Sequence, residues 1–272
     1  NNLLIKKKLL APKMISNNYI KNYIEIEDFG DLTVLQLLKK SNEKKLFYYK
    51  KIILLLKKIQ KIKIKKIKTF TNTEYIIPDY SKEKLLNEAK LFLQWYLPKF
   101  IKGKRRKVEQ KKMSKIFKNL LNRLLYKKKV FIHRDFHISN IMITKQGLGL
   151  IDNQDAVFGN ITYDLASLID DVRFKTDKKL KEKILNQFFK NNKSLNKDKF
   201  KNDFEILSVL RNFKIIGIFS RLSKRDQKHK YLKLVPHAWK LIEDRIRNNN
   251  KFEDLKNIID KNFPKKIRKN EN

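Results

Sequence analysis

Apolar residues recur every three to four positions along most of this chain, which is the spacing of amphipathic helices. The longest such stretch runs from residue 32 to residue 67, and its last part, residues 61–68, is predicted to be a basic connector. Ser81 is predicted to cap a helix that reaches Leu97 and is stopped by Pro98. Residues 2–10 resemble the end of a helix, and further helices are predicted around residues 113–124 and at 163–172, 178–189, 200–222, 231–247 and 252–263.

Other segments have shorter apolar runs and are predicted to be strands. Residues 23–28 alternate apolar and acidic side chains, as a half-buried strand does, before Phe29-Gly30-Asp31 interrupts the pattern. The runs at residues 130–132, 141–143 and 148–151 are too short for helices, and polar residues follow each of them. The pattern therefore predicts an α+β protein, mostly helical, with a small hairpin in its middle.

Composition narrows the class of protein. The chain has 272 residues, which allows one or two domains, and its 41% of hydrophobic residues can build a sizeable core. The absence of Cys excludes disulfide bonds, a thiolate nucleophile and any zinc or iron–sulfur site with Cys ligands. No apolar run approaches the roughly 18 residues that a membrane span needs. No signal peptide opens the sequence, so we expect a cytoplasmic protein that does not bind membranes.

The formal net charge is +38, because the chain has 66 Lys and Arg residues and only 28 Asp and Glu residues. Such an excess is typical of nucleic-acid-binding proteins. Here the basic residues are spread along the whole chain, and most are Lys, which like the abundant Asn and Ile has codons rich in A and T. We therefore interpret the charge as a solvated surface and do not expect nucleic acid as a partner. The alternative, a non-catalytic basic nucleic-acid-binding module, rests on the charge alone and predicts binding that falls steeply with salt.

Candidate chemistry is concentrated in residues 133–140, which read His-Arg-Asp-Phe-His-Ile-Ser-Asn directly after an apolar run. Asp152 stands just after another such run. A carboxylate at the start of a loop, such as Asp135, can orient and deprotonate a hydroxyl group. The oxygens of Asn140 and Asp152 can bind one Mg²⁺, which neutralises charge during phosphoryl transfer. This order and context are those of the catalytic loop of kinases.

The histidines of this segment allow other interpretations. His133 is expected to be structural, with its ring hydrogen-bonded to the backbone. His137 could pack within the loop or contact a substrate, and the sequence favours neither. A zinc site made of His133, Asp135 and His137 has suitable residue types, but the segment lies between strands and lacks the spacing of a metal-binding helix, so we do not expect one.

The motif resembles that of the aminoglycoside phosphotransferase family, small-molecule kinases with a protein-kinase-like fold. Residues 151–168 resemble the family's strand with the metal-binding Asp and the helix after it, and residues 24–31 resemble the hinge between the two lobes. The likeness is closest to the branch that phosphorylates N-acetylmuramate and N-acetylglucosamine at the anomeric hydroxyl in cell-wall recycling. It covers residues 10–248, and this branch is indicated by Glu88, Leu91, Phe92, Trp95 and the segments 211–226, 231–236 and 239.

The resemblance implies ATP and Mg²⁺ as cofactors and a small-molecule substrate. Asp135 would be the catalytic base, and Asn140 and Asp152 would hold Mg²⁺. The backbone of the hinge would meet the adenine, at Glu27, Asp28 and Phe29.

The resemblance also implies residues near the substrate. Asp155 would lie beside the metal or the sugar, and Asp164 would brace the catalytic loop from a buried position. Two readings, sugar or carboxylate recognition and ordinary helix packing, stay open for Glu88, Arg221 and Arg225. Packing is favoured for Trp95. The acceptor could instead be an aminoglycoside, choline or another small alcohol.

The predicted lobes follow from the same resemblance. Residues 1–31 would be a partial N-lobe with the hinge, residues 32–263 the mostly helical C-terminal lobe, and residues 264–272 a frayed tail. The family's phosphate-covering loop and its strand Lys should precede the hinge, yet few residues do so here and none forms a Gly-rich loop. We therefore expect an N-terminally incomplete chain, and a degenerate, non-catalytic kinase lobe is a third hypothesis.

Overall fold

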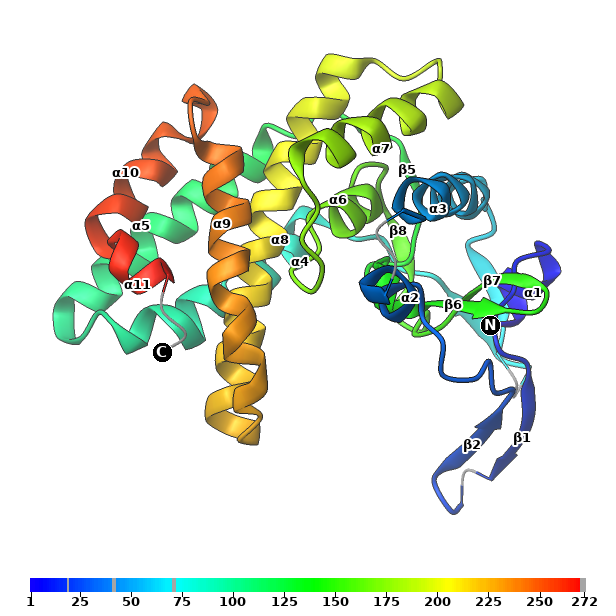
Figure 1. Ribbon diagram of the computed structural model, residues 1–272. Coiled ribbons are helices and arrows are strands. Elements are labelled where there is room, and N and C mark those ends of the chain that lie inside the picture. The colour runs from blue at the N-terminus through cyan, green and yellow to red at the C-terminus, as the bar shows by residue number, and fades with distance from the viewer. Residues whose placement is uncertain (19, 41–42, 70–71, 270–272) are drawn as a thin grey trace. The chain divides into compact units, whose positions relative to one another are not determined.

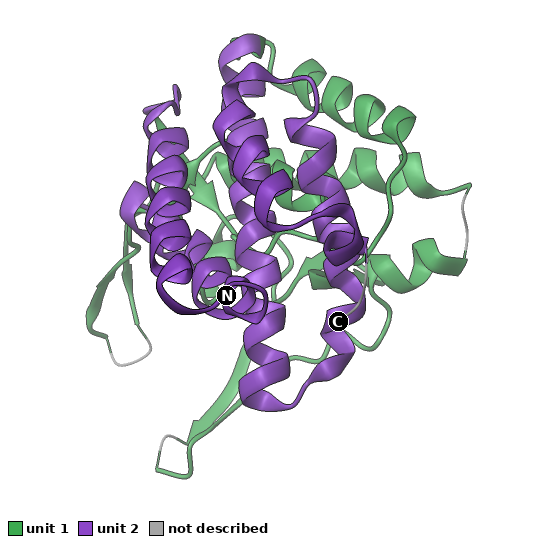
Figure 2. Cartoon of the chain, turned by 90° about the vertical axis from the view of Figure 1, so that its left-hand side faces the viewer, with its two compact units in different colours: residues 1–79, 128–197 green, residues 80–127, 198–272 purple. Residues whose placement is uncertain are grey.

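The computed structural model describes residues 1–18, 20–40, 43–69 and 72–269, and most of these residues are helical (Figure 1). They form two compact units (Figure 2). Unit 1 combines residues 1–79 with residues 128–197, and unit 2 combines residues 80–127 with residues 198–272. Each unit is thus built from two separate segments, and neither unit begins or ends at the boundary predicted after residue 31.

The strands that the structure describes form antiparallel pairs in unit 1. The pairs are β1 (Met14–Asn18) with β2 (Tyr23–Ile26), β3 (Lys66–Lys68) with β4 (Glu74–Ile76), β5 (Lys129–Ile132) with β8 (Val157–Asn160), and β6 (Ile141–Thr144) with β7 (Gly147–Leu150). The strands predicted near residues 23, 130, 141 and 148 are confirmed, whereas β1, β3, β4 and β8 are not predicted by the sequence pattern.

Strand β2 differs from the prediction in its burial. All of its residues are exposed, although their alternation of apolar and acidic side chains predicts one buried face. Within the described part of the chain β2 pairs with β1 alone, so neither face of this hairpin is packed on a core. In Figure 1 the hairpin extends away from the other elements of unit 1.

Helices account for the rest of unit 1. They are α1 (Asn2–Lys6), α2 (Val34–Lys40), α3 (Lys45–Gln60), the short η3 (Ile138–Asn140), α6 (Tyr163–Ile169) and α7 (Lys178–Asn191). Helix α3 buries Ile52, Leu56 and Ile59, and it packs against α7. The stretch predicted as helical from residue 32 to residue 67 is therefore two helices followed by the start of a hairpin, because Ile67 alternates with exposed Lys in β3.

The described elements of unit 2 are all helical. They are α4 (Lys82–Ala89), the π-helix η1 (Phe92–Tyr96), η2 (Leu97–Lys99), α5 (Gly103–Asn122), α8 (Lys197–Asp226), η4 (His229–Leu234), α9 (Val235–Ile246), η5 (Asn250–Phe252), α10 (Glu253–Asn262) and α11 (Lys265–Lys269). The predicted cap of α4 is confirmed, since the Ser81 hydroxyl accepts a hydrogen bond from the Lys84 backbone N–H at 3.1 Å. Within the described residues, no helix is both long and apolar enough to span a bilayer.

The core of unit 2 is an aromatic cluster around Phe92, the first residue of the π-helix. Its ring contacts those of Phe213, Trp239 and Phe263 at centroid distances of 4.8–5.6 Å. The Trp239 indole N–H donates a hydrogen bond of 3.0 Å to the Tyr96 hydroxyl. Aromatic edge-to-face contacts of this kind add to the burial of large apolar surfaces, so this cluster anchors η1 to α8 and α9.

The C-terminal segment is more ordered than the sequence predicts. Residues 265–269 form α11, and the Arg268 guanidinium is buried between Glu243 at 2.9 Å and Asp260 at 3.0 Å. The prediction of a frayed tail is therefore wrong for residues 265–269. Apolar periodicity does not predict this helix, because the buried side chain that fixes it is a charged one, Arg268. Residues 270–272 lie outside the described residues.

Candidate active site

The loop after β5 is held by a carboxylate from α6. Asp164 is fully buried, and its Oδ2 and Oδ1 accept hydrogen bonds from the backbone N–H groups of His133 at 2.7 Å and Arg134 at 3.0 Å. Arg134 has a left-handed backbone, with φ of 72°. Because most non-Gly residues avoid that region, the two bonds to one carboxylate are what keeps the chain in this turn. Asp164 thus has the bracing position that the family resemblance implies.

The turn brings together the three residues that carry the predicted chemistry. The Asn140 amide nitrogen donates to the backbone oxygen of Asp135 at 3.1 Å and to Oδ2 of Asp152 at 3.3 Å. Asp152 also has a left-handed backbone, with φ of 64°, and its Oδ1 accepts a hydrogen bond of 2.8 Å from the Gln154 side chain. The Asn140 side chain therefore links the catalytic loop at Asp135 to Asp152, which follows the end of β7.

The donor set at this point fits Mg²⁺. The Asn140 side chain lies beside the exposed Asp152 carboxylate, and the two side chains together offer amide and carboxylate oxygens, which are hard donors. Proteins usually bind Mg²⁺ through one or two such side chains and leave the other positions to water and phosphate oxygens. Asn140 and Asp152 would hold the ion in that manner, and the bound ion would supply charge neutralisation to a phosphoryl group.

The geometry does not favour the zinc alternative. The described part of the chain has no group of three or more His, Asp or Glu side chains placed to hold a metal ion. The His133 ring is buried and its Nε2 lies 3.0 Å from the backbone oxygen of Ile151. The His137 ring is also buried, with Nδ1 3.2 Å from the Ser139 hydroxyl. Both rings thus have the loop-shaping contacts expected of structural histidines.

The His133 ring is held neutral by its surroundings. Burial lowers the pKa of His133, and the nearby Asp135 carboxylate opposes this shift only in part. A carbonyl oxygen can only accept, so Nε2 carries the proton and donates it to Ile151. This bond joins the catalytic loop to the residue that precedes Asp152.

The predicted hinge residues lie against the same hairpin. The Phe29 ring covers Gly149 in β7 so closely that a Cβ at residue 149 would lie 2.6 Å from Cε2 of Phe29. Asp28 accepts a hydrogen bond of 2.7 Å from the Gly30 backbone, and Glu27 donates its backbone N–H to the oxygen of Lys13 at 2.8 Å. The apolar pattern around Gly149 does not predict this contact, although a Gly inside an apolar strand signals close approach of another group.

The chain before and after the hinge also pairs with this hairpin. The Leu150 backbone N–H donates to Leu10 at 2.8 Å, and the Ile143 backbone N–H donates to Leu32 at 2.8 Å. The predicted adenine-binding segment and the β6–β7 hairpin, which lies between Asn140 and Asp152 in the chain, are therefore tied together by backbone hydrogen bonds within unit 1.

Asp155 lies three residues after Asp152 and is largely exposed. Its carboxylate is 3.8 Å from the Arg134 guanidinium, and its backbone oxygen accepts a hydrogen bond of 3.3 Å from the same group. The contact is long, so it leaves the Asp155 carboxylate accessible to solvent.

The other predicted substrate residues lie in unit 2. Glu88 accepts hydrogen bonds from Tyr80 and from Lys214, the latter at 2.8 Å. Arg225 is exposed and binds the neighbouring Asp226 through both Nε at 2.8 Å and Nη2 at 3.0 Å. The Nε atom of Arg221 is buried and has no hydrogen-bond partner among the described residues. The structure thus places these residues on α4 and α8, in a different unit from Asp135, and their roles stay predictions.

Comparison with known proteins places the fold and the site in context. The family model of the APH phosphotransferase enzyme family matches residues 37–195, more than half of the chain and all of the loop described above. The chain belongs to this family. Its members are phosphotransferase enzymes, and the predicted aminoglycoside phosphotransferase fold is thereby confirmed.

Individual relatives of this family member carry a common name. The N-acetylmuramate/N-acetylglucosamine kinase of Neisseria meningitidis is 33% identical over 60% of this chain and 51% of its own length. The kinase of the same name from Pseudomonas aeruginosa is 25% identical over 92% of this chain and 72% of its own length. The chain thus spans about half the length of the Neisseria relative in that comparison.

A solved structure supports the fold assignment of this family member. The ADP-bound aminoglycoside phosphotransferase APH(2'')-Ib superposes with a TM-score of 0.58 at 17% identity, covering 89% of this chain and 78% of that one. At this identity the similarity shows the fold alone.

Proposed function

We propose that the protein is an ATP- and Mg²⁺-dependent phosphotransferase whose acceptor is the anomeric hydroxyl of an amino sugar, N-acetylmuramate or N-acetylglucosamine. The observation that carries the proposal is the Asn140 side chain, which binds both the Asp135 backbone and the Asp152 carboxylate. The name shared by the relatives from Neisseria and Pseudomonas supports the choice of acceptor. Such an activity belongs to cell-wall recycling in the cytoplasm.

The chemistry that we propose uses few side chains. Asp135 accepts the proton of the acceptor hydroxyl as that oxygen attacks the γ-phosphorus of ATP, and ADP leaves with the bond to the β–γ bridging oxygen. Asn140 and Asp152 would hold Mg²⁺, and the bound ion would neutralise charge on the phosphates. Asp164 and the neutral ring of His133 are positioning residues, because they fix the turn that bears Asp135.

Activity measurements with a matched control test the base. In a complete chain, we expect transfer of phosphate from labelled ATP to either amino sugar, and we expect Asp135→Ala to lose about 10²–10⁴ in turnover, the typical worth of a positioned base. Asp254→Ala removes an exposed carboxylate in the first turn of α10 and should leave turnover unchanged. Wild-type turnover in Asp135→Ala would refute the assigned base.

A binding measurement separates the metal site from the base. We expect ATP with Mg²⁺ to raise the melting temperature of the wild type and of Asp135→Asn, but not of Asp152→Asn. Transfer of phosphate to an aminoglycoside or to choline, and not to the amino sugars, would overturn the proposed acceptor. The proposed phosphotransferase activity would still stand. If ATP with Mg²⁺ does not stabilise the protein and no acceptor is phosphorylated, the results would favour the degenerate, non-catalytic lobe.

A further inference from the structure

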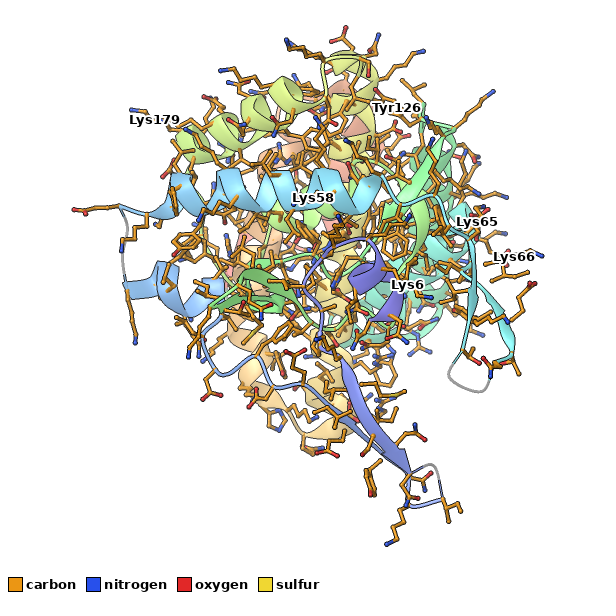
Figure 3. All side chains as sticks on the ribbon, turned by 90° about the vertical axis from the view of Figure 1, so that its right-hand side faces the viewer. Lys6, Lys58, Lys65, Lys66, Tyr126 and Lys179 are labelled. Atoms are coloured by element: carbon orange, nitrogen blue, oxygen red, sulfur yellow. The ribbon has the colours of Figure 1, made fainter. Side chains whose placement is uncertain are left out.

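Two adjoining pockets of about 260 and 310 Å³ lie in unit 1 and share Lys8 and Lys58 in their linings. Their walls come from the segment after α1, from α3 and from the β6–β7 turn. Figure 3 faces this side of the molecule, with Lys6 of α1 and Lys58 of α3 labelled. We call the two together the lysine pocket and define it by the ammonium groups in its lining, those of Lys7, Lys8, Lys51, Lys58 and Lys61.

Helical spacing explains how α3 builds its side of the lysine pocket. Lys51, Leu54, Leu55 and Lys58 recur three to four residues apart, so they share one face of the helix, and Lys61 follows at its C-terminal cap. The leucines form an apolar floor between charged ends. Leu54 is 50% exposed, so this floor presents apolar surface to solvent.

The charges of the lysine pocket are not neutralised from within the protein. Neither lining contains an Asp or a Glu, and no ion pair of these lysines is found among the described residues. Lysines elsewhere in unit 1 do have such partners, as Lys65 and Lys129 do in Asp79. The Lys51 ammonium lies 4.4 Å from the centre of the Phe47 ring, a contact that keeps its charge. Like charges gathered in this way favour a bound polyanion.

The backbone at Lys8 adds an independent observation. The Leu9 N–H donates to the Leu4 oxygen at 3.0 Å and the Lys8 N–H donates to the Ile5 oxygen at 2.9 Å, which together close the end of α1 as a Schellman motif. Lys8 occupies the left-handed position of this motif, with φ of 56°, where Gly is the usual residue. A Lys thus stands where Gly is the usual residue, and this Lys belongs to the lining of both pockets.

We propose that the lysine pocket binds a small polyphosphate anion, with the ammonium groups on its phosphates and the leucine floor under any uncharged part. The site shares no residue with the proposed phosphotransfer site and does not depend on that function. The lysine pocket is connected to the phosphotransfer site through the backbone. Leu10 in the lining of the pocket accepts a backbone hydrogen bond from Leu150, which lies two residues before Asp152.

Calorimetric titration with inorganic pyrophosphate, in the absence of Mg²⁺ and at constant ionic strength, tests the proposal. We expect saturable binding at one site per chain, and Lys58→Gln should weaken it about tenfold, since a charge-assisted contact is lost while helix propensity is kept. Single phosphate should bind more weakly than pyrophosphate. The absence of saturable binding up to about 1 mM would overturn the proposal.

The chain offers a matched control for generic attraction to a basic protein. A second basic pocket of about 660 Å³ lies between α3 and α7 and is also lined by lysines, among them Lys183 and Lys190. Lys183→Gln removes the same charge there and should leave the affinity for pyrophosphate within about twofold of wild type. Equal losses in Lys58→Gln and Lys183→Gln would mean that the binding is non-specific, and the proposal would fail.

Two further variants separate this site from folding and from catalysis. Lys8→Gly should raise the melting temperature, because Gly accepts the left-handed backbone, and still weaken pyrophosphate binding severalfold. Unchanged affinity in that stabilised variant would contradict the role of Lys8. Asp152→Asn should bind pyrophosphate as the wild type does, even though it loses the response to ATP with Mg²⁺. Loss of pyrophosphate binding in Asp152→Asn would place the ligand at the phosphotransfer site instead.

Discussion

Asp164 shows how much of the candidate site depends on a residue that touches none of the chemistry. Its carboxylate accepts hydrogen bonds from the His133 and Arg134 backbone N–H groups, and it is fully buried. A carboxylate that accepts two backbone bonds lowers the free energy of a turn that Arg134 would otherwise avoid. The shape of the catalytic loop therefore depends on α6.

Replacing this carboxylate with an amide tests the bracing role. We expect Asp164→Asn to lower the free energy of unfolding by about 2–3 kcal/mol, because one charged acceptor becomes an N–H group that faces another donor. Urea denaturation with an unchanged m-value measures this. Asp254→Asn, an exposed carboxylate at a helix start, is the control and should change stability by less than about 0.5 kcal/mol. A loss in Asp164→Asn no larger than the control's would contradict the bracing role.

Single residues were the part of the site that sequence predicts best. Asp135, Asn140 and Asp152 are recognisable because phosphoryl transfer restricts residue type and order, and the structure brings them together. Gly149 was missed, because a Gly in a strand shows that something approaches it but not what. Only the fold identifies Phe29 as that group.

At the scale of elements, the π-helix η1 packs closely against the long helix α8 at Gly217, which has no side chain. A Cβ on Gly217 would lie 2.3 Å from the carbonyl carbon of Leu91 and 2.4 Å from the nitrogen of Phe92. Helix propensity favours Ala over Gly by about 1 kcal/mol, whereas overpacking costs about 1–3 kcal/mol. Contact with backbone leaves nothing flexible to move aside, so the steric cost should exceed the gain in propensity.

We therefore expect Gly217→Ala to be destabilising by about 1–2 kcal/mol, although propensity alone predicts the opposite sign. Chemical denaturation followed by circular dichroism measures the change. Lys224→Ala, at an exposed position of the same helix, should stay within about 0.5 kcal/mol of wild type. A more stable Gly217→Ala variant would mean that α8 and η1 are not in such close contact.

Asp79 connects two of the strand pairs through charge. It lies 2.7 Å from Lys129 of β5 and 3.0 Å from Lys65, next to β3, and the hydrogen bond from Lys129 is the main reason why the pKa of Asp79 is below its usual value. A lowered pKa stabilises the fold above the ordinary pKa of an Asp, and this contribution is lost as the pH falls through the lowered value.

This sign leads to a prediction for acid stability. Asp79→Asn should cost about 0.5 kcal/mol at pH 7, a small value because the side chain is 39% exposed and screened by solvent. The difference from wild type should begin to shrink as the pH falls below about 4 and should vanish below the lowered pKa of Asp79. Urea midpoints of both proteins between pH 7 and pH 3 measure it, and a difference that grows toward low pH would show that the sign is wrong.

Elements were predicted unevenly, for physical reasons. Long helices such as α5 and α8 bury repeating apolar positions, so their existence follows from the sequence. Strands β3 and β4 are three residues each, mostly exposed and rich in charge, so no buried face marks them. The π-turn of η1 does not follow from the sequence, because its apolar run resembles that of any buried helix.

At the scale of the whole molecule, the compact units could not be predicted from local patterns. Each joins two segments that are separated in the chain by a segment of the other unit. Periodicity describes which face of an element is buried but not which distant element covers it. The resemblance to a kinase family supplied the fold class, whereas the units follow from long-range packing.

The net charge leads to a prediction for the molecule as a whole. A formal charge of +38 on 272 residues means that folding brings like charges together, and this repulsion opposes the compact state. Salt screens interactions between exposed charges over about 10 Å at 0.1 M.

Raising sodium chloride from about 0.05 to 0.5 M should therefore increase the melting temperature, by about 2–4 °C for each kcal/mol of relieved repulsion. A melting temperature that falls with salt would mean that surface ion pairs outweigh the repulsion. The same titration near the isoelectric point of about 10.1 is the control, because the net charge is smaller there and the increase should shrink.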